Sequence, residues 1–267
     1  MLETVLFMMA GGIKKGNMMK KLLLISMIIP SIAFAISNND IDAIKRSHYN
    51  ELEKMGLPTP DTGIQLVSKN ELTMQKWQQE KYISESQELK SKGYVQKNSD
   101  EAQFLMNIKN EIRKIQPIQE PVYKPSDSHL RLNPNDIVFS YTYIGVPKSE
   151  MEEFYGIAPG GTYIKGEQFG WTGAIEFFKT NFAHCSYNEN NMFISKGAVR
   201  IDEEKAKYLV NNKITLVDVE GNETTGYLYR VNWYDSIFNH DLQCASKVYS
   251  SEIKDKTIEL AKKIDNQ

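Results

Sequence analysis

The chain has 267 residues, of which 41% are hydrophobic and 25% are charged, with 16 glycines and 9 prolines. This composition excludes a polytopic membrane protein, a collagen-like fibre and a fully disordered chain. Because 32 Lys and Arg residues nearly balance 34 Asp and Glu residues, the net charge of −2 provides no basic field, and we expect no nucleic-acid partner.

Residues 1–35 are predicted to be an N-terminal extension followed by a cleavable signal peptide. A short basic segment at 18–21 (Met-Met-Lys-Lys) precedes an uncharged, mostly apolar run at 22–32, and Ala-Phe-Ala at 33–35 matches the small residues that signal peptidase requires. The apolar run is shorter than the roughly 20 residues that span a bilayer. Residues 14–17 (Lys-Lys-Gly-Asn) precede the basic segment, and Lys-Gly codons can encode a ribosome-binding sequence. We therefore expect translation to start at one of the two methionines of the basic segment. The mature protein is expected to be periplasmic or secreted, with no transmembrane anchor.

Residues 36–116 are predicted to be a helical region with helices over 40–55, 68–92 and 99–115. In the first and third helices, apolar residues recur every three or four positions. Gly93 is expected to end the second helix, and Ser99 to cap the third. A linker is then predicted over 117–135, because its prolines block helix formation and favour extended chain. We place a domain boundary in this linker.

Residues 136–267 are predicted to form a β module. Apolar and polar side chains alternate along 137–143 and 171–177, and two further runs predict a hairpin, 214–219 and 225–233 with a turn at 220–222. Helices are expected at 149–155, 202–210 and 251–264. The fold class is therefore predicted to be α+β. A helical N-terminal region is followed by an antiparallel β-sheet or sandwich-like module with a C-terminal helix.

The only two cysteines, Cys185 and Cys244, both lie in the predicted β module. In an exported protein they are expected to form a disulfide. The alternative is a cysteine nucleophile with His184 or His240 as its base. Since neighbouring residues on a strand point to opposite faces, His184 and Cys185 make a poor catalytic pair.

No cofactor and no metal are predicted from the remaining motifs. His184, His240 and Asp241 could form an acid–base or metal site, but the chain lacks the ligand spacing of a zinc site. A carboxylate pair such as Glu152 and Glu176 can be chosen, although nothing in the sequence fixes the distance between the two side chains. No catalytic residue is therefore assigned.

The glycine-rich stretch 156–173 is not a phosphate-binding loop, since it lacks the Gly-Lys-Ser/Thr ending and a strand-turn-helix frame. It is expected to form a mobile loop that carries Tyr163, Phe169 and Trp171. Aromatic side chains of this kind suit protein or sugar contacts. Together with Trp233 in the predicted hairpin, they are the candidate binding residues.

We therefore interpret the sequence as an exported bacterial binding or interaction module with a protein or carbohydrate partner. One alternative is a secreted hydrolase that uses His240, Asp241 or His184. Another is a structural subunit of an envelope or secretion assembly. The sequence pattern carries no prediction of the oligomeric state.

Overall fold

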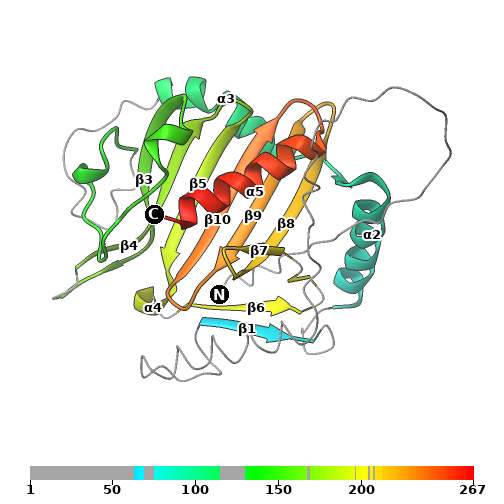
Figure 1. The fold of residues 1–267 in the computed structure, drawn as a ribbon, viewed down its shortest axis with the longest axis horizontal. Helices are drawn as coiled ribbons and strands as arrows, with labels where there is room; N and C mark the ends of the chain where they lie inside the picture. The colour runs from blue at the N-terminus through cyan, green and yellow to red at the C-terminus, as the bar shows by residue number, and fades with distance from the viewer. Residues whose placement is uncertain are drawn as a thin grey trace, which may run out of the picture.

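The computed structural model describes residues 63–68, 75–114, 130–166, 169–195, 197–203, 205–206 and 208–267. Its centre is an eight-stranded sheet in the order β2-β8-β9-β10-β5-β4-β3, in which β7 also pairs with β8 (Figure 1). The strands are β2 (Val95–Gln96), β3 (Glu153–Ile164), β4 (Gly170–Lys179), β5 (His184–Asn191), β7 (Tyr208–Val210), β8 (Lys213–Asn222), β9 (Gly226–Tyr234) and β10 (Phe238–Ser246). A separate parallel pair joins β1 (Gly63–Val67) to β6 (Ala198–Asp202).

Helix α5 (Ser251–Asp265) lies across one face of the sheet, which we call the α5 face (Figure 1). Its buried residues Leu260 and Ile264 share a core cluster with Val231 and Trp233 of β9. These β9 residues are two positions apart and so point to the same face. Ser250 caps the helix by accepting a hydrogen bond from the Glu252 amide at 3.2 Å. The predicted C-terminal helix is confirmed.

Helix α3 (Asp100–Lys114) packs on the opposite face, which we call the α3 face. Its residues Ala102 and Leu105 form a core cluster with Leu228 of β9 and Ala245 of β10. The Ser99 hydroxyl accepts a hydrogen bond from the Ala102 amide at 3.2 Å, as expected for an N-terminal cap. The third predicted helix and its cap are therefore confirmed.

The predicted fold class is wrong. The described part of the chain is mostly β-sheet, and its N-terminal portion is not a separate helical region. Two strands, β1 and β2, arise between 36 and 116, and β2 joins the central sheet beside β8. The physical reason is that the apolar side of α3 is buried against the sheet rather than against other helices. One sheet flanked by helices on both faces replaces the expected sandwich-like module.

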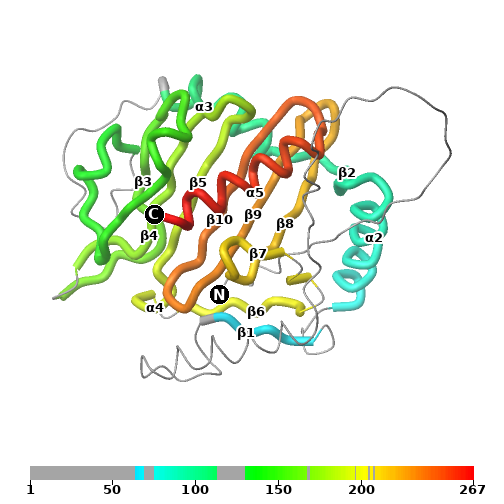
Figure 2. Tube along the Cα trace, in the orientation of Figure 1, coloured from blue at the N-terminus to red at the C-terminus, as the bar shows by residue number. Residues whose placement is uncertain are grey.

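Helix α2 (Lys76–Lys92) begins eight residues later than predicted, because Gln75 rather than Ser68 precedes its first turn. The Gln75 amide donates a hydrogen bond to Gln78 Oε1 at 2.7 Å, and Ser68 instead follows strand β1. Gly93 ends the helix in the left-handed conformation at φ 84°, as predicted. Figure 2 shows α2 beside the β2 edge of the sheet.

The strand predicted at 137–143 is wrong. No residue from 137 to 143 belongs to a named strand, and an isolated bridge between Phe139 and Trp171 attaches this stretch to β4. Gly170 permits this close approach, since a Cβ atom there would lie 2.6 Å from the Phe139 carbonyl carbon and the residue has φ +128°. We call residues 137–146 the cover segment, because its later residues contact the α5 face of β4.

Three further expectations in the C-terminal half are corrected. Residues 149–155 form a short 3₁₀ turn, η3 (Lys148–Glu150), followed by the start of β3. The predicted helix at 202–210 is replaced by the end of β6, a turn and β7. The glycine-rich stretch is not a loop, because most of it belongs to the antiparallel β3–β4 hairpin.

The predicted hairpin of β8 and β9 is confirmed, but its turn lies at 223–225 rather than 220–222. The Asn222 side chain explains this position. Its Oδ1 accepts hydrogen bonds from the amides of Thr224 and Thr225, both at 2.9 Å. An asparagine that binds the backbone two residues ahead is a common turn initiator.

Several sequence predictions fall on residues outside the described part. These are the signal peptide, the helix at 40–55 and most of the proline-rich linker, so the domain boundary stays a prediction. Short 3₁₀ turn η2 (Pro134–Asp136) and helix α4 (Met192–Ser195) complete the described elements. Among the residues that the structure describes, no helix has the length and apolar character needed to cross a membrane.

Candidate functional site

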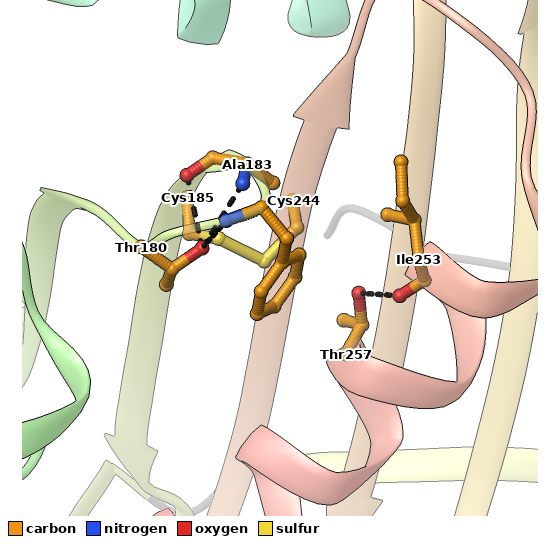
Figure 3. Close-up of a disulfide and its surroundings, with 7 residues drawn as sticks. Thr180, Ala183, Cys185, Cys244, Ile253 and Thr257 are labelled. Atoms are coloured by element: carbon orange, nitrogen blue, oxygen red, sulfur yellow. Dashed lines mark hydrogen bonds between the residues drawn. A yellow bond between two sulfur atoms is a disulfide. The ribbon is translucent and has the colours of Figure 1, made fainter.

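The predicted disulfide is present. Cys185 of β5 and Cys244 of β10 are directly paired across the antiparallel ladder and are bonded to each other (Figure 3). Both residues are fully buried, within the core that α5 covers. A bonded, buried cysteine cannot act as an exposed nucleophile. The cysteine-nucleophile alternative is therefore not supported by this structure.

The structure does not bring His184, His240 and Asp241 together. His240 lies on the α5 face, because it pairs with Glu189 and with Trp233. Its neighbour Asp241 points to the α3 face. His184 also lies on the α3 face, but four residues of strand, about 13 Å, separate its register position from that of Asp241.

Asp241 belongs to a partly buried ionic group that links helix α3 to the sheet through the exposed Glu101. Arg230 Nη2 donates to Glu101 Oε2 at 2.5 Å, while its Nε lies 4.0 Å from Asp241 Oδ1. Burial raises the pKa of the neighbouring Asp218 to about 7, although the charge of Arg230 opposes this rise. The arrangement is that of a structural anchor for α3.

The four candidate binding aromatics have different environments. Trp233 is fully buried and donates its Nε1 hydrogen to Asp265 Oδ1 at 2.8 Å, so it is a core residue. Trp171 is 7% exposed and contacts the half-buried Tyr163 edge to face, with ring centroids 5.5 Å apart. Phe169 is 52% exposed. Of these four residues, only Phe169 and the half-buried Tyr163 reach the surface.

A larger constellation on the α5 face was not predicted as a site. Glu176 of β4 and Glu189 of β5 are both buried, and their strands are adjacent. Glu176 pairs with Tyr187, and Ala174 pairs with Glu189, so the two carboxylates are diagonal neighbours on one face. Among the described residues, no Lys or Arg side chain forms an ion pair with either glutamate.

Tyrosines surround these two glutamates, and we name Glu176, Glu189, Tyr141, Tyr143 and Tyr187 the acidic tyrosine cluster. Tyr187 Oη donates to Glu189 Oε2 at 2.9 Å. The cover segment supplies Tyr141 and Tyr143, whose hydroxyl groups face Glu189 and Glu176 respectively.

Gly145 of the cover segment lies directly against the Glu176 carboxylate. A Cβ atom at this position would be 2.8 Å from Glu176 Oε1 and 2.7 Å from the Tyr143 hydroxyl, and its φ is +78°. The next amide, that of Val146, donates to Glu176 Oε2 at 2.9 Å. The backbone of the cover segment is thus held on the carboxylate, and only glycine fits there without displacement.

A series of polar contacts extends from the cluster to the β9–β10 turn. Tyr187 Oη lies 2.7 Å from His240 Nδ1, and His240 Nε2 lies 3.5 Å from Asp235 Oδ2. Lys213 Nζ is 3.1 Å from the same Asp235 oxygen. The ring of Trp233 stacks on His240 with centroids 4.8 Å apart, which fixes the plane of the imidazole.

Burial controls the protonation of the cluster. Desolvation raises the pKa of Glu176 to about 7, while the nearby Tyr143 hydroxyl and the hydrogen bond from the Val146 amide act in the opposite direction. Desolvation also raises the pKa of Glu189. At Asp235, burial is outweighed by the nearby His240 ring and the hydrogen bond from the Phe238 amide, so the pKa falls below its ordinary value. The glutamates at one end of this series of side chains and Asp235 at the other therefore differ strongly in acidity.

Comparisons with known proteins return no match: no protein family, no curated protein and no solved structure is similar to this chain. Within the described ranges, no group of three or more His, Cys, Asp or Glu side chains is placed to hold a metal ion.

Proposed function

We propose that the chain is an exported binding module that docks a protein partner through the end of its β3–β4 hairpin. Export is supported by the basic, apolar and small-residue pattern of residues 18–35. The disulfide between Cys185 and Cys244 is consistent with an oxidising compartment.

The exposure of Phe169 is the observation that carries the proposal. This side chain is 52% exposed at the start of β4, beside the packed pair of Trp171 and Tyr163. We call Tyr163, Phe169 and Trp171 the hairpin-end surface. Leu132 and Ile144 are also more than half exposed but do not belong to it, because Arg131 pairs with Ile157 and Gly145 contacts Glu176, both several residues from the hairpin end.

The hairpin-end surface is held on paired backbone. Tyr163 pairs with Trp171, and Ile164 pairs with Gly170, in the antiparallel β3–β4 ladder. Phe169 adjoins Gly170, which packs against the cover segment. Large apolar side chains on an ordered surface lose little conformational entropy when a partner covers them. Such a surface favours a protein partner over a carbohydrate.

Site-specific photo-crosslinking tests this proposal. With p-benzoylphenylalanine in place of Phe169, irradiation of native cells is expected to give one discrete protein adduct. The purified partner should then bind Phe169→Ser about 30-fold more weakly than the unchanged chain, which corresponds to the roughly 2 kcal/mol of an aromatic anchor. Binding is measured by calorimetry.

Val248 provides the matched control, because it is 68% exposed in the segment between β10 and α5. The crosslinker at position 248 is expected to give no adduct, and Val248→Ser should bind with unchanged affinity. Equal adducts from both positions, or none from 169, would contradict a docking role for the hairpin end. A carbohydrate adduct would redirect the proposal to glycan recognition.

A second candidate function is acid–base catalysis at the acidic tyrosine cluster. It is favoured by the convergence of His240 with Glu189 and by the pKa of about 7 at Glu176, since catalytic acids and bases are often shifted toward neutrality. Hydrolysis of nitrophenyl esters and glycosides, abolished by Glu189→Gln, would support this function. Equal rates with and without the substitution would exclude Glu189 as the catalytic group.

A further inference from the structure

We propose that Glu189, Tyr187, His240 and Asp235 form a proton relay. In this relay, one proton is shared between the Glu189 carboxyl group and the His240 imidazole through the Tyr187 hydroxyl. The contacts that carry the inference are Tyr187 Oη to Glu189 Oε2 at 2.9 Å and Tyr187 Oη to His240 Nδ1 at 2.7 Å. The inference does not depend on the proposed docking function.

Asp235 fixes which imidazole nitrogen takes part. Its Oδ1 accepts the amide hydrogens of Ile237 and Phe238 at 2.8 and 2.6 Å, and its Oδ2 lies 3.1 Å from Lys213 Nζ. Asp235 is therefore held as a carboxylate, and a carboxylate is only an acceptor. Because its Oδ2 faces His240 Nε2 at 3.5 Å, we assign a proton to Nε2. The Nδ1 atom is then either bare or protonated.

The single hydroxyl hydrogen of Tyr187 allows two arrangements. In the first, Glu189 is ionised and accepts from Tyr187, while His240 Nδ1–H donates to Tyr187 Oη, so the imidazole is a cation. In the second, the protonated Glu189 carboxyl donates to Tyr187 Oη, and Tyr187 donates to the bare Nδ1. The first becomes the second when Nδ1 gives its proton to Tyr187 as Tyr187 gives its own to Glu189. Two protons have each moved to the next group, the net effect is transfer of one proton from His240 to Glu189, and the total charge is unchanged.

The surroundings allow both arrangements. Burial and the charge of Asp235 disfavour an ionised Glu189, while the Tyr187 hydroxyl and the His240 ring favour it. Asp235 Oδ2 places a negative charge 3.5 Å from the ring of His240. The other titratable or charged groups around the relay are Tyr141 and Tyr143 of the cover segment, Lys213 of β8 and Asp265 of α5. Burial also raises the pKa of Tyr187 well above its ordinary value, so this hydroxyl transmits a proton without ionising.

The test measures the imidazole nitrogens of His240 by ¹⁵N NMR of histidine-labelled full-length protein. Glu189→Gln presents an amide that can donate to Tyr187 Oη, and so imitates the second arrangement. We expect this substitution to shift the Nδ1 signal of His240 downfield, toward that of a bare nitrogen. In Tyr187→Phe, which keeps the ring but lacks the hydroxyl, the same Glu189 substitution should leave the His240 signals unmoved.

Tyr155→Phe is the matched control, since Tyr155 Oη lies 3.2 Å from His184 Nδ1 outside the relay. It should move the His184 signals and not those of His240. A His240 Nδ1 signal that ignores Glu189→Gln in the otherwise unchanged protein would overturn the relay. This single comparison remains decisive if Tyr187→Phe does not fold. An equal response with and without the Tyr187 hydroxyl would also overturn it.

Discussion

Reduction of the Cys185–Cys244 bond is expected to lower the free energy of unfolding by about 4 kcal/mol. The cysteines are 59 positions apart, and a cross-link over such a loop removes much of the conformational entropy of the unfolded chain. Cys185→Ala and Cys244→Ala should each cost at least as much, because both side chains are fully buried. The double variant should cost little more than either single variant, since one bond is lost in all three.

Chemical unfolding followed by near-UV circular dichroism measures these differences. The reduced, otherwise unchanged protein is the control, because it loses the bond without losing any side-chain atoms. It separates the effect of the cross-link from the effect of the cavity. Strongly unequal single variants, or full additivity in the double variant, would contradict the stabilising role assigned to the bond. Thiol titration of the unfolded, unreduced protein should find no reactive cysteine.

The parts of the fold that were predictable depend on local signals. Ser99 and Ser250 cap helices α3 and α5, and the spacing of the apolar residues that follow each cap indicates a helix. The hairpin of β8 and β9 was found from alternation on both sides of a turn. The disulfide followed from the presence of only two cysteines.

The acidic tyrosine cluster was missed because alternation was interpreted as a difference between core and solvent. On β4, the predicted alternation places Ile175 and Phe177 on one side of the strand and Glu176 on the other. In the structure both sides are covered, Phe177 by α3 and Glu176 by the cover segment, so the glutamate is the more buried of the three. A strand covered on both faces carries no simple alternation.

The convergence of the cluster is also non-local. Its residues come from β4, β5 and the cover segment. His240 belongs to β10, which lies between β9 and β5 in the sheet and so brings His240 next to β5. The cover segment resembles a strand in its pattern of Ile137, Phe139, Tyr141 and Tyr143. Those aromatic residues instead pack on each other, with Phe139 and Tyr143 stacked at 4.9 Å. Sequence spacing alone does not distinguish these two arrangements.

The second large effect is expected at Glu176, as a loss of stability with rising pH. Its pKa rises from 4.5 to about 7 on folding, chiefly through desolvation. Between these values the folded protein binds more protons than the unfolded chain, so its stability falls as pH increases. The stabilising contribution is fully present below pH 4.5 and is lost by about pH 7. A shift of this size corresponds to about 3 kcal/mol.

Glu176→Gln should remove this dependence, because the neutral amide can still accept the hydrogen bond of the Val146 amide. Between pH 4.5 and 8, the variant should therefore gain about 3 kcal/mol in unfolding free energy relative to the unchanged protein. Urea unfolding at several pH values measures the difference. Glu152→Gln is the matched control, since Glu152 is paired with Lys179 at 2.6 Å on the surface and should leave the pH dependence intact. Parallel pH profiles for Glu176→Gln and the unchanged protein would show that the Glu176 carboxyl is not held protonated by its burial beneath the cover segment.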